Sequence, residues 1–319
     1  MTTFAQKYTA IATQVDLYYG EMNESNLNLA SMYALTNTAF SGVALMKKHE
    51  EVHTAVQPVL NVFATFKLEY LQPQFIAYFF TNKGNQISYE ELKIRIQTLT
   101  KAGFPSNQSM LEAALLLTGG ENHAQRSYAL FKELKKRQPL LTNAMDLPMC
   151  VFIMQNEELN SKQIAETIEM YYEHLKKAFR RGNHLQLLAM VLAIFRPQYN
   201  AHAVSYVESI KAKLESEGIK VTRKSYVSLG ILAMHEADVE LMNEVNILYK
   251  ELITTKYLKH NKAQALQLAV QKTVQDYTEL SNRTLKNQQL PYLDNILLIV
   301  QFMHIIPVSL FLPDISFLQ

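Results

Sequence analysis

Apolar residues along this chain gather in short runs that return at regular intervals, with polar segments between them. Six such runs can be superimposed, and consecutive runs begin about 36 to 41 residues apart. Five of the six contain a small or compact residue, which lets a neighbouring helix approach closely. The runs therefore predict a repeated apolar helix, and their first residues are Pro73, Leu111, Leu147, Leu187, Ser228 and Leu266.

A second, amphipathic helix is predicted after each of the first five runs. Each of these segments carries a bulky apolar residue followed three positions later by Leu or Ile, a spacing that places both on one helix face. Turn-forming residues separate the two helices of a pair, and capping boxes at Ser109 and Asn183 predict two helix starts. The apolar pairs are Ile96 and Leu99, Phe131 and Leu134, Tyr172 and Leu175, Val207 and Ile210, and Tyr249 and Leu252.

Together these helix pairs predict an all-α fold, an αα-superhelix in which helix-turn-helix repeats stack as a solenoid. The period lies between the tetratricopeptide length of about 34 residues and the HEAT or armadillo range of about 40 to 47, so the fold is TPR/HEAT-like. No segment alternates with a period of two, so no sheet is expected. We expect residues 1–70 to form a helical N-terminal cap, 71–290 about six two-helix repeats, and 291–319 an apolar C-terminal capping helix, in one continuous domain.

The apolar segment from Ile296 to Leu312 has two interpretations. It is slightly shorter than the roughly 18 residues that a membrane-spanning helix needs. Pro307 would also kink or end a helix within it. A buried terminal helix that covers the open end of the core is the favoured interpretation, and contact with a membrane is the alternative.

Composition excludes several classes of protein. Hydrophobic residues make up 48% of the chain and charged residues 19%, which excludes intrinsic disorder. The formal net charge of +2 argues against a dedicated nucleic-acid binder. The single Cys150 cannot form an internal disulfide, and the first twenty residues lack the continuous apolar centre of a secretory signal. We therefore expect a cytoplasmic protein.

The middle of the chain resembles a bacterial family known as domain of unknown function 4003. Three strings carry the resemblance, which covers roughly residues 105 to 236. It implies a cytoplasmic helical protein and brings no assigned activity and no catalytic residues. The strings are Leu141-Thr142-Asn143-Ala144-Met145-Asp146-Leu147-Pro148, Tyr172-Glu173-His174-Leu175-Lys176-Lys177-Ala178-Phe179 and Asn183-His184-Leu185-Gln186-Leu187.

One pentapeptide, His49-Glu50-Glu51-Val52-His53, matches the H-E-x-x-H pattern of zinc proteases. In that chemistry, two histidines one turn apart hold the metal and the glutamate polarises a bound water. Glu51 is charged where such helices usually carry an apolar residue, and no second signature supplies a third ligand. A half-exposed helix end is the favoured interpretation, and a zinc-dependent hydrolase that uses His49, Glu50 and His53 is the alternative.

Positive charge gathers where second helices end. In a stacked solenoid, equivalent positions line up, so these residues could form one basic edge that meets an acidic peptide or another polyanion. Cations near helix C-termini are also stabilised by the helix dipole, by about 0.3 to 1 kcal/mol, which explains them without a partner. The first two groups are Lys135, Lys136 and Arg137, and then Lys176, Lys177, Arg180 and Arg181.

A stacked array of helix pairs leaves an extended curved surface, which usually serves binding. We therefore expect a non-catalytic helical-repeat scaffold that binds a protein or peptide partner and needs no cofactor. Nucleic acid and membrane are not expected partners. The zinc hydrolase and the polyanion or regulatory binder with a basic edge stay open as alternatives.

Overall fold

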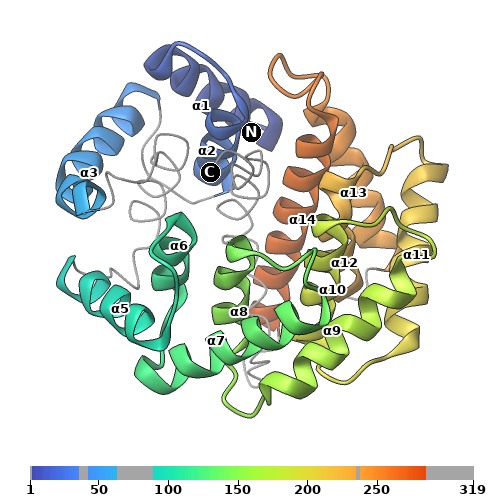
Figure 1. The fold of residues 1–319 in the computed structure, drawn as a ribbon. Helices are drawn as coiled ribbons and strands as arrows, with labels where there is room; N and C mark the ends of the chain where they lie inside the picture. The colour runs from blue at the N-terminus through green and yellow to red at the C-terminus, as the bar shows by residue number, and fades with distance from the viewer. Residues whose placement is uncertain (1, 36–41, 63–88, 235–237, 285–319) are drawn as a thin grey trace. The chain divides into compact units, whose positions relative to one another are not determined.

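The structure, a computed structural model, describes residues 2–35, 42–62, 89–234 and 238–284, and within them every regular element is helical (Figure 1). The predicted all-α class is confirmed. Two short 3-10 turns, Ala144–Asp146 and Arg223–Ser225, precede helices α8 and α12. The α-helices are α1 (Phe4–Tyr19), α2 (Glu24–Leu35), α3 (Gly42–Val62), α5 (Tyr89–Ala102), α6 (Gln108–Leu116), α7 (Gly120–Arg137), α8 (Leu147–Ile153), α9 (Ser161–Leu175), α10 (Asn183–Phe195), α11 (Ala201–Ser216), α12 (Tyr226–Met234), α13 (Val239–Leu252) and α14 (Lys262–Thr284).

The described residues divide into two compact units, one up to Lys162 and one from Gln163 onward. The first holds α1 to α8, and the second holds α10 to α14 with almost all of α9. The run at Pro73, the predicted domain boundaries near residues 70 and 290, and the apolar segment 296–312 lie outside the described residues. None of the described helices is both long enough and apolar enough to cross a membrane.

Helix α1 shows how local sequence sets a helix start in the first unit. The Thr3 hydroxyl accepts the Gln6 N–H, and the Gln6 side chain accepts the Thr3 N–H, so two backbone donors are satisfied reciprocally. The helix ends at Gly20, whose φ of 75° lies in the left-handed region that glycine adopts without steric cost. Its apolar face packs against α2 and α3, where Tyr33 and Leu45 are fully buried.

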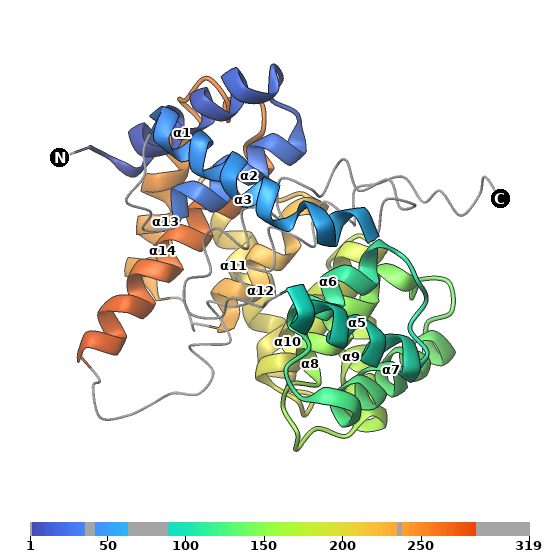
Figure 2. The same cartoon turned by 90° about the vertical axis from the view of Figure 1, so that its left-hand side faces the viewer.

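Among the described helices, amphipathic and largely buried helices alternate from α5 to α13. Five of the six predicted apolar runs lie in α6, α8, α10, α12 and α14, and the five predicted residue pairs lie in α5, α7, α9, α11 and α13. All seven residues of α8 are buried. Helix α6 packs against α8 in the first unit, and α10 lies beside α12 in the second (Figures 1 and 2). The two helix types that the hydrophobic pattern predicts are therefore present.

Gly230 allows the close approach of α12 to α10. A Cβ atom at this position would lie 2.9 Å from side-chain methyl groups of both Leu188 and Val191. Real Cβ atoms do not come this close, so a larger residue would push the two helices apart. The small residue in this apolar run has the packing role that the sequence pattern predicts.

Side chains of one helix pair also cap the first helix of the next pair, and we call these contacts inter-pair caps. Arg95 of α5 donates to two carbonyls at the end of α6, at 3.3 and 3.4 Å. Arg126 of α7 donates to three carbonyls at and beyond the end of α8, at 2.7 to 3.3 Å. In the second unit, the Thr167 and Tyr171 hydroxyls of α9 donate to carbonyls that follow α10, at 2.7 and 3.3 Å. Each contact supplies a donor to carbonyls at a helix end, where intrahelical partners are missing, or in the turn that follows it.

The two capping boxes predicted within the repeats were wrong. Asn107 caps α6, because its side-chain oxygen accepts the Met110 N–H at 3.2 Å and its backbone is extended, and Ser109 lies inside the helix. Helix α10 starts at Asn183 itself, after Gly182, which has no side chain to cap it. In both cases the N-cap position is occupied by an earlier residue than the pattern predicts, Asn107 for α6 and Gly182 for α10.

Candidate functional site

The first histidine of the predicted zinc motif lies inside the first unit, between two tyrosines. His49 of α3 is fully buried. Its Nδ1 atom lies 2.5 Å from the hydroxyl of Tyr33 in α2, and its Nε2 atom lies 2.7 Å from the hydroxyl of Tyr19 in α1. The His49 side chain therefore links α3 to both α1 and α2 through hydrogen bonds.

Burial keeps this cluster neutral. It lowers the pKa of His49 to about 4, and the nearby His53 adds to the shift. Burial also raises the pKa of Tyr19 and of Tyr33 well above the ordinary value for tyrosine. A neutral imidazole offers one N–H donor and one acceptor nitrogen, so each tyrosine hydroxyl completes one side of the ring.

The same hydrogen bonds bear on the zinc hypothesis. A histidine binds zinc through an unprotonated nitrogen that points at the metal, and both nitrogens of His49 already face tyrosine hydroxyls. Within the described ranges, no group of three or more His, Cys, Asp or Glu side chains could hold a metal ion. Zinc binding by His49 and His53 stays a prediction, which metal analysis of the purified protein would test. The arrangement shows a structural role for His49.

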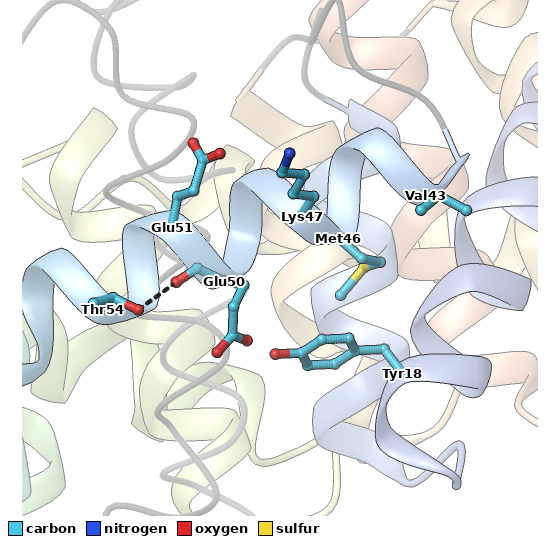
Figure 3. A pocket seen from close by; sticks show the side chains of 7 residues that line it. All are labelled: Tyr18, Val43, Met46, Lys47, Glu50, Glu51 and Thr54. Carbon is cyan, nitrogen blue, oxygen red and sulfur yellow. Dashed lines mark hydrogen bonds between the residues drawn. The ribbon is translucent and has the colours of Figure 1, made fainter.

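Beside this cluster, an open hollow of about 570 Å³ lies between the end of α1 and the outer face of α3 (Figure 3). Two of its residues are large apolar side chains with much of their surface in solvent: Val43 is 77% exposed and Tyr18 is 42% exposed. Leu17, the neighbour of Tyr18, is 74% exposed. The residues that line the hollow are Tyr18, Val43, Met46, Lys47, Glu50, Glu51 and Thr54.

The ring of Tyr18 is held in place by the histidine cluster. It makes an edge contact with the Tyr19 ring, with centroids 4.8 Å apart, and another with the His49 ring at 5.8 Å. Edge-on arrangements at these distances are favourable for aromatic rings. The buried cluster therefore positions the one aromatic side chain that lines the hollow.

The charged residues of α3 around the hollow differ in their partners. Glu51 pairs with Lys48 at 2.8 Å, which lowers the pKa of its carboxyl group. Glu50 is exposed, and within the part of the chain that the structure describes its carboxylate has no hydrogen bond or ion pair. Figure 3 shows the Glu50 carboxylate on the Tyr18 side of the helix, while the Lys47 and Glu51 side chains extend from the other side.

The predicted basic residues lie in both units and differ in what they bind. Lys135 donates to two backbone carbonyls in the turn that follows α7, at 2.7 and 2.8 Å, and Arg137 lies 4.0 Å from Glu133. Lys136 is exposed. After α9, Lys176 pairs with Glu173, and the exposed residues are Lys177, Arg180 and Arg181. Alignment of the two groups along one basic edge stays a prediction.

Sequence reasoning missed the tyrosines that contact His49. The spacing of Leu45, His49 and Val52 places His49 on the apolar face of α3, and this signal alone could have shown that the histidine faces the core. No comparable signal identifies Tyr19 and Tyr33, because they come from other helices. Cys150 is buried, and burial raises the pKa of its thiol, as expected for an inert cysteine.

The comparison with family models gives one match, to residues 7–303, described as Protein of unknown function (DUF4003). The chain belongs to this family. The DUF4003 match covers most of the chain, including the N-terminal helices that form the hollow, so it reaches well beyond residues 105 to 236, where the resemblance was seen first. No curated protein and no solved structure matches the chain.

Proposed function

We propose that this DUF4003 protein is a non-catalytic helical-repeat scaffold, and that it binds a partner protein through the hollow between α1 and α3. One observation carries the proposal: Val43 and Tyr18 expose apolar surface at the same hollow. Single exposed apolar residues are common on protein surfaces, whereas a cluster around a concavity is typical of an interaction site.

The alternation of helices supports the superhelical part of this proposal. Apolar helices follow amphipathic ones from α5 to α14, and inter-pair caps link successive pairs within each unit. In repeat proteins, contacts between neighbouring pairs carry most of the stability and the surface is left for binding. Near-neutral charge and a single buried cysteine fit a scaffold that works in the cytoplasm.

Site-specific photo-cross-linking in cells tests the proposal. A photoreactive amino acid at Val43 should give a discrete adduct with one partner. The same amino acid at Val239, which is 72% exposed in α13, is the matched control and should give none. Tyr18→Ser should remove the adduct at position 43, because it removes the aromatic wall of the hollow. Equal adducts at both positions, or an adduct that persists in Tyr18→Ser, would contradict partner binding at this surface.

A further inference from the structure

We propose that the hollow receives a lysine or arginine side chain from an amphipathic segment of the partner protein, with Glu50 as the opposite charge. This inference rests on the proposed function and specifies the chemistry of the partner. The apolar face of the same segment would cover Val43, which is exposed at the hollow.

The charges that line the hollow favour a cation at Glu50. Glu50 presents a carboxylate on the Tyr18 side of α3 and makes no ion pair with the described residues, and the lining cation Lys47 extends from the other side of the helix (Figure 3). The neighbouring Glu51 is already neutralised by Lys48. A partner with a cation at this point would therefore gain a charge-assisted hydrogen bond, whereas an acidic segment would meet repulsion.

The side chains beside that carboxylate also suit a long cationic residue. Tyr18 offers a ring that attracts a cation, and its edge contacts with Tyr19 and His49 fix its position before any partner arrives. Val43 supplies exposed apolar surface at the same hollow. Lysine and arginine have long aliphatic stems that pack on such surface while the charged end meets a carboxylate. One aromatic ring, one exposed aliphatic side chain and one carboxylate thus match a single long cationic side chain.

Selection from random dodecapeptides displayed on phage, with the full chain as the target, tests this chemistry. We expect the enriched peptides to share a lysine or arginine next to apolar residues. Glu50→Gln should weaken their binding about tenfold, the loss of one charge-assisted hydrogen bond. Glu90→Gln, at an exposed glutamate of α5 that does not line the hollow, makes the same change in charge, should leave binding unchanged and serves as the matched control.

The possible outcomes separate the two proposals. Two results would refute recognition of a cationic side chain and still support partner binding at the hollow. In the first, the enriched peptides depend on Tyr18 but carry no lysine or arginine. In the second, they bind the Glu50→Gln variant as tightly as the wild type. Enriched acidic peptides would do the same. If no enriched peptide depends on Tyr18, the hollow is not a peptide-binding surface, and both proposals fail at this site.

Discussion

At the residue scale, His49 shows how one polar side chain organises the N-terminal helices. It lies in the core, bonds one tyrosine from each of two other helices, and supports the ring of Tyr18 at the surface. A buried polar group that is fully hydrogen-bonded fixes a unique arrangement, and losing one partner leaves the other unsatisfied. The cluster therefore couples the stability of the core to the shape of the hollow.

We expect Tyr33→Phe to lower the free energy of unfolding by about 1 to 3 kcal/mol, because it leaves Nδ1 of a buried histidine without its hydroxyl partner. The matched control is Tyr18→Phe, which removes a hydroxyl from a partly exposed ring and should change stability by less than about 0.5 kcal/mol. Urea denaturation followed by circular dichroism measures both. Equal stability of the two variants would show that the hydrogen bond contributes nothing.

Two buried groups should give the stability of the protein opposite dependences on pH. The pKa of His49 is lowered to about 4, so the unfolded chain binds more protons than the folded one between about pH 4 and 6.5, and stability rises with pH there. The pKa of Asp146 is raised to about 7, chiefly by burial, so the folded chain binds more protons between about pH 4 and 7, and stability falls as pH rises.

Urea denaturation between pH 4 and 7 separates these effects. His49→Gln removes the rising contribution, so the slope of stability against pH should become more negative than in the wild type. Asp146→Asn removes the falling contribution, so the slope should become more positive. Each contribution amounts to about 2 to 3 kcal/mol over its window. Variants whose slopes both parallel the wild type would rule out titration of these groups in the folded chain.

The histidine motif itself was visible in the sequence, but its role was not. A pentapeptide identifies residues one helical turn apart, whereas the partners of His49 lie 16 and 30 residues away in the chain. Whether a histidine binds a metal or a tyrosine depends on these distant residues. The exposed apolar surface at Val43 could not be predicted either, since it depends on how α1 meets α3.

At the element scale, the helices follow from the hydrophobic pattern, but the contacts between them do not. Burial on one helix face is a local signal with the period of the helix, so both helix types were predictable. The inter-pair caps are different, because Arg126 reaches carbonyls 28 to 33 residues further along the chain. An arginine in an amphipathic helix looks the same in sequence whether it faces solvent or a neighbouring helix end.

The variant Arg126→Met tests how much an inter-pair cap contributes to the free energy of unfolding. It keeps an apolar stem but removes the arginine donor from three carbonyls at and beyond the end of α8, of which Asn156 O still accepts the Leu159 N–H, so we expect a loss of about 1 to 3 kcal/mol in unfolding free energy. Lys136→Met, an exposed position in the same helix, is the matched control. Hydrogen exchange should also become faster between residues 154 and 160 in Arg126→Met alone. Unchanged exchange in that segment would refute a capping role.

At the scale of the whole molecule, the chain combines a nearly balanced charge with local groups of cations. Three residues of the predicted basic edge, Lys177, Arg180 and Arg181, are exposed after α9, and polyanion binding by this edge stays a prediction. If they bind polyanions, retention on heparin should fall steeply with salt, and Arg180→Glu with Arg181→Glu should elute at lower salt than the wild type. Lys93→Glu with Lys101→Glu carries the same change in net charge on α5 and should elute later than that variant. If the two double variants eluted at the same salt concentration, retention would depend on net charge alone and not on Arg180 and Arg181.

The inter-pair caps have a consequence for how this protein could be cut and recombined. A segment that contains only the pair α8 and α9 would lack Arg126 of α7. The carbonyls at the end of α8 would then lose their inter-pair cap. A segment from Gly120 to Asn160 instead keeps Arg126 together with the carbonyls that it binds. A segment that keeps its inter-pair cap is therefore shifted by one helix from the helix pair that the hydrophobic pattern predicts, and we expect chimeras joined in that shifted phase to be more stable than chimeras joined at the start of a pair.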